Sequence, residues 1–229
     1  MHVVFVEPSF PANQKEFVRA LHQAGAAVTG IGERPKDSLD ADLRRWLVHY
    51  EQVSTVVDAD ALVRTVAWVS ERMAVDRLEA TVEAHVMAAA QAREALGIPG
   101  TSVRTAWLCR DKPAMKDVLR EGGVPTAASM GGDAPAEIIA FAARVGYPLI
   151  VKPRSGAGAS GATRVDSDDE LLAALGAAGV GHGGSVAVEE FVEGHEGFYD
   201  TITAGGHVLH DFVSHYFPNV LEAMRTRWI

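Results

Sequence analysis

Apolar residues recur in the first part of the chain with two different periods. Short apolar runs at residues 3–6 and 28–31 have the length of buried strands, and between them Phe17, Val18 and Leu21 lie at helical spacing. A strand, a helix and a second strand in this order favour a parallel sheet with helices packed on it. The pattern therefore predicts an α/β fold for the amino-terminal part of the chain.

The same alternation of strands and helices continues towards a boundary near residue 100. Strands are predicted over residues 53–57 and 75–78, and apolar residues at helical spacing follow each of them. The segment 97–100 contains two glycines and a proline, which end the last helix. We assign residues 1–100 to a Rossmann-like domain and residues 101–229 to a second domain.

The second domain opens with helices rather than with a strand. Asp111 is the expected N-cap of the first helix, and the second helix follows Pro135. Further along, residues 198–203 and 207–213 are expected to form a hairpin. This order of elements distinguishes the second domain from the first.

Three histidines, His207, His210 and His215, fall on the predicted hairpin. At strand spacing His207 and His210 point to opposite faces, which argues against a shared metal ion. We therefore expect no metal site on the hairpin.

The centre of the second domain carries the pattern with the clearest chemistry. An apolar run ends in Lys152, a small-residue loop spans residues 155–161, and residues 163–165 have the pattern of a strand. A second apolar run, residues 186–188, leads into an acidic segment over residues 189–196. The backbone N–H groups of a glycine loop and a lysine ammonium both suit polyphosphate, whereas carboxylates accept hydrogen bonds from an amine or a ribose diol. The stretch predicts a nucleotide site.

Residues 156–161 match G-x-G-x-x-G, but their context excludes the dinucleotide-binding motif. That motif passes directly into a helix, so that the pyrophosphate meets the helix N-terminus. Here a strand follows, and the next helix starts only at Ser167, in a capping box completed by Glu170. No glycine lies between Phe5 and Phe17, so the first domain is a weak candidate for a pyrophosphate site. A Walker A loop is excluded because no Gly-Lys-Ser/Thr follows the glycines.

Composition and charge narrow the class of protein. Hydrophobic residues at 48% and charged residues at 22% are ordinary for a soluble globular chain, and a net charge of −9 argues against nucleic acid as the main partner. The single Cys109 cannot form an internal disulfide. The amino terminus lacks the basic region of a signal peptide, and no window approaches the ~20 apolar residues of a membrane helix. We expect a cytoplasmic protein with no membrane partner.

Together, Lys112, Lys152, the small-residue loop and the acidic segment resemble the ATP-grasp superfamily of carboxylate–amine ligases, because the four pieces occur in the order of the family. The resemblance implies an α/β protein with a Rossmann-like pre-ATP-grasp domain over residues 1–100. It also implies an α+β ATP-grasp domain over residues 101–229, with a lid subdomain at about residues 125–188 and only the start of the large half.

The resemblance also implies a role for each motif. Lys112 and Lys152 would contact the ATP phosphates, the glycine loop would close over the β- and γ-phosphates, and the acidic segment would bind adenosine. The residues implied are Lys112, Lys152, Gly156, Gly158, Ser160 and Gly161 for the phosphates, Glu189, Glu190, Phe191 and Val192 for adenine, and Glu196 for the ribose. Each lysine could instead be a solvated surface charge, and the acids at 189 and 190 a solvated strand end.

The activity implied is that of an ATP-dependent ligase that joins a small-molecule carboxylate to an amine, with Mg²⁺ as cofactor. The family's magnesium-binding acids would lie beyond Ile229, because Asp200, Asp211 and Glu222 form no magnesium pattern, so no metal ligand is expected within the chain. We expect the 229-residue chain to be truncated and incompetent for full turnover, and a homodimer is compatible with the resemblance. The alternatives are a non-catalytic nucleotide-binding module or fragment, and another ATP-grasp chemistry such as biotin-dependent carboxylation.

Overall fold

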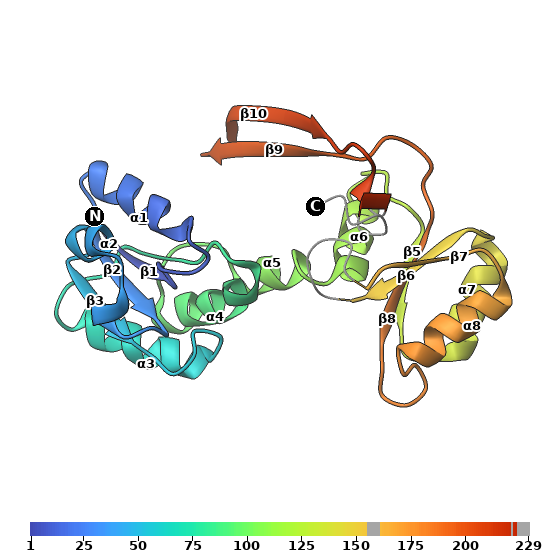
Figure 1. The fold of residues 1–229 in the computed structure, drawn as a ribbon, viewed down its shortest axis with the longest axis horizontal. Helices are drawn as coiled ribbons and strands as arrows, with labels where there is room; N and C mark the ends of the chain where they lie inside the picture. The colour runs from blue at the N-terminus through green and yellow to red at the C-terminus, as the bar shows by residue number, and fades with distance from the viewer. Residues whose placement is uncertain (155–160, 221, 224–229) are drawn as a thin grey trace. The chain divides into compact units, whose positions relative to one another are not determined.

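The computed structural model describes residues 1–154, 161–220 and 222–223. The chain divides into two compact units, Met1–Cys109 and Arg110–Ile229 (Figure 1). Each unit has its own sheet and its own hydrophobic core.

The first unit is built on a parallel sheet with the strand order β3-β2-β1-β4 (Figure 1). Its strands are β1 His2–Val6, β2 Ala27–Gly32, β3 His49–Gln52 and β4 Arg77–Glu79. Its helices are α1 Gln14–Gln23, α2 Ala41–Trp46, α3 Ala59–Ser70, α4 Val86–Leu96 and α5 Val103–Leu108, with short 3₁₀ turns at Lys36–Ser38 and Glu83–His85. The predicted α/β architecture of this part is confirmed.

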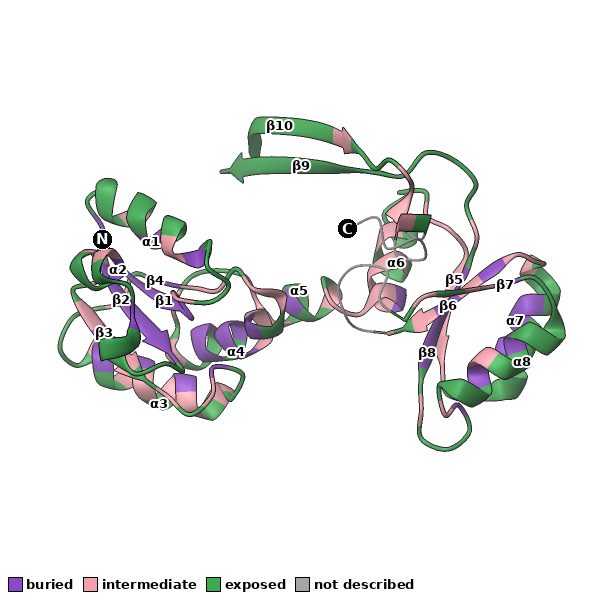
Figure 2. Ribbon diagram, viewed as in Figure 1, coloured by how far each residue is buried: buried purple, intermediate pink, exposed green. Residues whose placement is uncertain are grey.

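Helices cover both faces of this sheet, and the interior strand β1 is buried on both sides. On one face Val4 and Val6 pack with apolar residues of α3 and α4, such as Leu62. On the other face Phe5 packs with residues of α1 and α2, including Val18. All five residues of β1 are buried, which accounts for its continuous apolar run (Figure 2).

The third strand lies earlier than the sequence pattern predicts. The strand occupies His49–Gln52, which pairs with β2, whereas residues 53–57 form no strand. Strand β3 is at the sheet edge and mostly polar, so hydrophobicity does not mark it. Val56 is nevertheless fully buried in the core of the first unit, which explains the misleading apolar run.

The second unit contains a four-stranded antiparallel sheet with the strand order β5-β8-β6-β7. A separate two-stranded antiparallel ribbon is formed by β9 and β10 (Figure 1). Its strands are β5 Ser129–Gly132, β6 Leu149–Pro153, β7 Thr163–Val165, β8 Val186–Glu190, β9 Gly197–Ala204 and β10 His207–His215. Its helices are α6 Lys112–Glu121, α7 Pro135–Val145 and α8 Asp168–Ala177. This arrangement is the expected α+β architecture.

The two faces of the β5-β8-β6-β7 sheet differ in chemistry. Alternate residues Leu149 and Val151 of β6 and Val188 of β8 pack against α7 and α8, for example against Phe141 and Leu171. The residues between them point to the opposite face, since side chains alternate along a strand. That opposite face carries Lys152 and Glu189 of the predicted nucleotide stretch.

Helix α8 begins with a cap that differs in one detail from the predicted box. Ser167 Oγ accepts a hydrogen bond from the Glu170 N–H at 3.3 Å, as expected for an N-cap. The Glu170 carboxylate reaches one residue further back than expected and accepts from the Asp166 N–H at 2.8 Å. The cap therefore ties the helix start to the end of β7.

The β9–β10 ribbon confirms the predicted hairpin, and a bulge in it corrects one expectation. The register shifts between Val208 and His210, so that His207 pairs with Ala204 and His210 with Ile202. Ala204 and Ile202 lie two residues apart on one face of β9, which places His207 and His210 on the same face rather than on opposite faces. Figure 2 shows that the ribbon is exposed along nearly its whole length.

Within the described ranges no helix is both long enough and apolar enough to span a bilayer.

Candidate functional site: a lysine-lined cleft

The second unit contains a cleft of about 970 Å³. It lies on the face of the β5-β8-β6-β7 sheet that does not pack against α7 and α8, beside the amino-terminal half of α6. Its lining residues are Lys112, Lys116, Ala127, Ile150, Lys152, Ala162, Arg164, Glu189, Glu190, Phe191, Val192, Glu193, Gly194, His195, Glu196, Tyr216, Asn219, Val220 and Glu222. The volume is within the range of pockets that bind small molecules and cofactors.

A buried carboxylate between two lysines forms the floor of the cleft. Glu189 is only 7% exposed, and its Oε2 lies 2.7 Å from Lys152 Nζ and 2.9 Å from Lys116 Nζ. Its second oxygen, Oε1, is also buried and has no hydrogen-bond partner among the residues that the structure describes. Buried polar atoms are normally paired, so this oxygen is a candidate acceptor for a ligand.

Strand register explains how residues distant in sequence meet here. Ile150 of β6 pairs with Glu189 of β8 on one side and with Arg164 of β7 on the other. Lys152 follows Ile150 by two residues and so lies on the same face, diagonal to Glu189. A diagonal pair across two strands is within reach of a long side chain such as lysine.

The lysines keep Glu189 ionised. Burial alone would raise the pKa of the Glu189 carboxyl, but hydrogen bonds from Lys152 and Lys116 outweigh burial, and the pKa is lowered. At neutral pH the cleft floor therefore holds one carboxylate and two ammonium groups, and it has a net positive charge.

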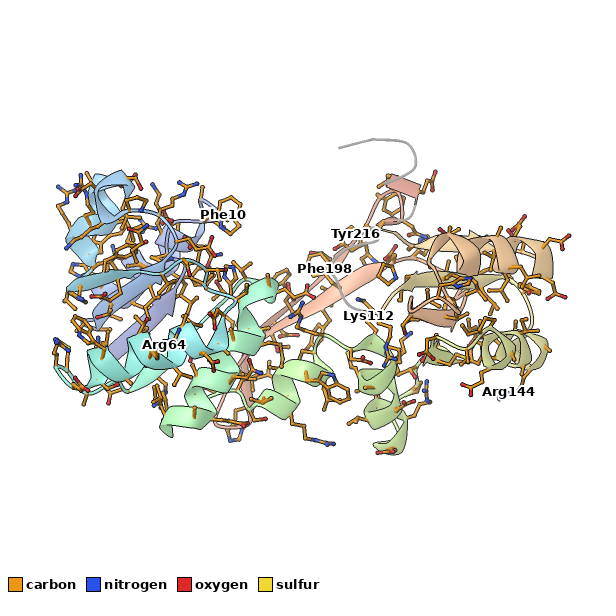
Figure 3. All side chains as sticks on the ribbon, turned by 90° about the horizontal axis from the view of Figure 1, so that it is seen from below. Phe10, Arg64, Lys112, Arg144, Phe198 and Tyr216 are labelled. Carbon is orange, nitrogen blue, oxygen red and sulfur yellow. The ribbon has the colours of Figure 1, made fainter. Side chains whose placement is uncertain are left out.

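Helix α6 brings two of the lysines to the cleft. Asp111 caps the helix, because its Oδ1 accepts from the Ala114 N–H at 3.0 Å, and its Oδ2 accepts from Arg154 at 2.9 Å. Lys112 occupies the first turn, at the end of α6 that Figure 3 shows with its label. The amino end of a helix favours anions, which adds to the charge of the lysines.

A glycine on β5 permits the close approach of α6. A Cβ at Gly131 would lie 2.9 Å from the Pro113 ring and 3.0 Å from the Arg154 guanidinium carbon. A larger residue at position 131 would push the start of α6 away from the sheet, and with it Lys112.

The predicted adenine-binding segment lines the cleft next to Glu189. Glu190 is tied to the sheet, since its N–H donates to the Ala128 carbonyl and its Oε2 accepts from the Ala128 N–H at 3.0 Å. Phe191 donates its N–H to the Pro148 carbonyl and stacks under the Arg164 guanidinium at 4.6 Å. The Val192 N–H makes no hydrogen bond to any described residue, which leaves a main-chain donor at the cleft wall.

Glu196 lies at the other end of the lining. Its Oε2 accepts a hydrogen bond from the Val220 N–H at 2.8 Å, and its own N–H donates to Asn219 Oδ1 at 3.0 Å. Asn219 also donates to the Gly194 carbonyl at 3.0 Å. These bonds fix the segment after β10 against the segment after β8.

Most of the residues predicted from sequence converge on this cleft. Lys112, Lys152 and Glu196 all line it, as do the residues from Glu189 to Val192. The predicted positions Gly156, Gly158 and Ser160 lie outside the described residues. Gly161 has a left-handed φ of +74° and directly precedes Ala162, which lines the cleft.

Two cationic residues of the cleft, Lys116 and Arg164, were not among the site residues predicted from the sequence. Helical spacing could have identified Lys116 as a site residue, because it lies four residues after Lys112 and hence on the same face of α6. Arg164 is the central residue of the short strand β7, and only the strand pairing shows that it points to the cleft.

Across residues 1–154, 161–220 and 222–223, no group of three or more His, Cys, Asp or Glu side chains is arranged to hold a metal ion.

The two parts of the chain match two family models. Residues 18–100 match the ATP-grasp N-terminal domain, and residues 111–198 match the carbamoyl-phosphate synthase L chain, ATP binding domain. Fold and sequence thus define an ATP-grasp type of architecture.

Individual relatives agree with these models. The chain is 27% identical over 184 residues to the L-arginine-specific L-amino acid ligase of Bacillus subtilis, a match that covers 78% of this chain and 45% of that protein. It is 31% identical over 138 residues to the D-alanine–D-alanine ligase of Pseudomonas entomophila, covering 55% of this chain and 43% of the ligase.

A solved structure shows the same fold. The L-amino acid ligase from Bacillus licheniformis superposes with a TM-score of 0.71 at 21% identity, over 93% of this chain and 50% of that one. The two family models together match most of the chain, which therefore belongs to the ATP-grasp superfamily, as its motifs predict. It spans about half the length of the relatives it matches.

Proposed function

We propose that the cleft of the second unit binds ATP and that the protein serves an ATP-dependent ligase reaction between a small-molecule carboxylate and an amine. The observation that carries the proposal is the convergence of Lys112, Lys116 and Lys152 with the buried Glu189 in one cleft. The positive charge of the cleft suits a triphosphate, and a buried carboxylate with an unpaired oxygen suits the amino group of adenine.

Within this proposal the cleft divides into two regions. Lys112, Lys152 and the glycine loop, part of a lid subdomain at about residues 125–188, would bind the phosphates. Glu189 Oε1 would accept from the adenine amino group, and the open Val192 N–H would donate to a ring nitrogen. Glu196 would receive the ribose hydroxyls.

The proposed chemistry follows from what such a cleft can stabilise. A carboxylate oxygen of the substrate attacks the γ-phosphorus of ATP, and the bond from that phosphorus to the bridging oxygen breaks to release ADP. The amine then attacks the acyl carbon, loses a proton, and expels phosphate. Lysine side chains neutralise the charge of the transferred phosphoryl group, the main way in which proteins accelerate this step. Mg²⁺ would arrive with ATP and add positive charge at its phosphates.

The names of the relatives favour ligation over the alternatives. An L-amino acid ligase and a D-alanine–D-alanine ligase both join a carboxylate to an amine, so we propose the same reaction class here. A cytoplasmic location, where ATP is available, is part of the proposal.

Nucleotide binding tests the first half of the proposal. We expect the wild-type chain to bind Mg-ATP and Lys152→Ala to weaken binding by more than tenfold, or about 1.4 kcal/mol, because one phosphate contact is lost. Isothermal titration calorimetry on both proteins measures this. Lys36→Ala, an exposed lysine of the first unit, is the matched control and should bind as wild type does. Equal affinities for wild type and Lys152→Ala would remove Lys152 from the site.

Turnover tests the second half. The complete gene product should release phosphate from ATP only when both a carboxylate and an amine acceptor from a suitable panel are present. Phosphate release that is indifferent to every carboxylate would exclude a ligase. ATP binding without any turnover would instead favour a non-catalytic nucleotide-binding module.

A further inference from the structure

The Glu189 carboxylate has one negative charge and two lysine partners in the cleft. Lys116 and Lys152 both bind Glu189 Oε2. The side chain of Lys116 is 15% exposed, that of Lys152 is 22% exposed and that of Glu189 is 10% exposed. Two ammonium groups on one carboxylate oxygen leave a surplus of one positive charge. One of the two lysine side chains can therefore turn away from Glu189, and the other still serves as its counter-ion.

The position of Lys152 makes it the lysine whose side chain turns away from Glu189. It stands at the second-last position of β6, and its side chain is more exposed than that of Lys116, at 22% against 15%. Lys116 lies a full helical turn inside α6, on a helix that is capped by Asp111 and packed at Gly131. A nucleotide phosphate would thus compete with Glu189 for Lys152 rather than for Lys116.

If Lys152 were the sole partner of Glu189, this competition would be costly. A carboxylate that is 7% exposed cannot be hydrated, and removing its only counter-ion leaves a buried charge without compensation. Phosphate binding would then have to overcome the loss of that ion pair. With Lys116 in place, the ion pair between Lys116 and Glu189 persists while Lys152 turns away.

We propose that Lys116 is a positioning residue that acts through Glu189: it holds the carboxylate in place and neutralised, so that Lys152 is free to bind the nucleotide phosphates. This inference rests on the proposed ATP site. It assigns Lys116 no contact with the nucleotide itself. Its effect on affinity should therefore depend on the charge of residue 189 and on the presence of phosphate.

A double-mutant cycle tests the dependence on Glu189. Lys116→Met should weaken ATP binding by tenfold or more, because Lys152 becomes the sole counter-ion of Glu189. In the background of Glu189→Gln, which carries no charge to neutralise, the same Lys116→Met change should alter ATP affinity by less than threefold. A tenfold loss in both backgrounds would mean that Lys116 acts on the nucleotide directly, and an unchanged affinity in Lys116→Met would mean that it does not act at all. Either result overturns the inference.

The phosphate dependence gives a second readout that a general packing role would not produce. Adenosine, which has no phosphate to recruit Lys152, should lose less than threefold in affinity on Lys116→Met. Both ligands can be measured by competition against a fluorescent ATP analogue. An equal loss for adenosine and ATP would point to a packing defect and overturn the inference.

Two further variants serve as controls. Lys116→Arg keeps a long cation and should restore ATP affinity to within about threefold of wild type, and failure to do so would contradict a counter-ion role. Lys36→Met is the control for the same substitution at an exposed site. Circular dichroism and thermal unfolding establish that each variant is folded. Should Lys116→Met itself not fold, the Arg variant and the Lys116→Met/Glu189→Gln double variant, which has no buried carboxylate at residue 189 to neutralise, decide the question.

The cycle also separates this inference from the proposed function. Absence of ATP binding by the wild-type chain overturns the proposed function, and the inference with it. Binding by wild type combined with any of the contrary patterns above overturns the role of Lys116 alone.

Discussion

The two units bury carboxylates in different ways. In the first unit Glu7 is 4% exposed and accepts hydrogen bonds from the Ser9 hydroxyl at 2.7 Å and from the Glu33 N–H at 3.0 Å. In the second unit Glu189 is bound by two lysine ammonium groups and keeps one oxygen without a described partner. The partners of Glu7 are a fixed main chain and a short side chain, whereas those of Glu189 are long and can rotate.

This difference separates a structural carboxylate from an adaptable one. Glu7 also has the one left-handed φ found for a non-glycine residue in the described ranges, +52°. Lysine carries four rotatable bonds and a charge that any phosphate can attract. The ion pairs of Glu189 are therefore the ones that we propose to change partners when a nucleotide binds.

The largest expected effect tests whether the two cores are independent. Leu62→Ala in the first unit and Leu149→Ala in the second each remove a fully buried side chain and should each cost about 2–5 kcal/mol of unfolding free energy. Hydrogen exchange resolved by peptide should show the loss in the mutated unit alone. Saturating ATP should restore protection to the second unit of Leu149→Ala but give no gain in the first unit of Leu62→Ala. Loss of protection across both units in either variant would show that the cores are coupled.

A smaller effect distinguishes two helix caps of the same chemistry. Asp58 caps α3 and Asp111 caps α6, each through one N–H, so replacing either by alanine should cost about 0.5–2 kcal/mol. Asp111→Ala also loses the ion pair with Arg154 and should weaken ATP binding, whereas Asp58→Ala should not. Denaturant unfolding and calorimetry measure the two quantities. Equal ATP affinities in the two variants would show that the α6 cap does not support the cleft.

The smallest expected effect is a difference between the two units in how their stability depends on pH. Burial lowers the pKa of His85 in the folded chain. As pH falls below about 6.5, the imidazole of the unfolded chain is protonated before that of the folded chain, so the first unit should lose stability. Despite burial, the lysines lower the pKa of Glu189, so its contribution should persist until pH falls below about 4.5. The slope for either group is at most about 1.4 kcal/mol per pH unit. His85→Gln should flatten the profile of the first unit alone, measured by peptide-resolved exchange corrected for pH. A flattened profile in the second unit would refute the assignment.

The sequence by itself determined the elements with strong local patterns. The buried run of β1, the helical spacing in α3 and the strand that ends near Lys152 are each visible within a few residues, because side chains repeat every 2 or 3.6 positions. Lys112, Lys152 and Glu189 could be chosen for the same reason, since each stands beside such a pattern and the three occur in the order of a known family.

Only the tertiary structure decided which of these side chains meet. Strand β3 is polar and was missed because its place at the edge of the sheet depends on pairing with β2 and not on hydrophobicity. A bulge between Val208 and His210 reverses the face that simple alternation predicts. The pairing of Lys116 with Glu189 joins residues that are far apart in sequence, through the docking of α6 and the register of β8. Local periodicity carries no information on register or docking, so the partners of a buried charge become visible only in the folded chain.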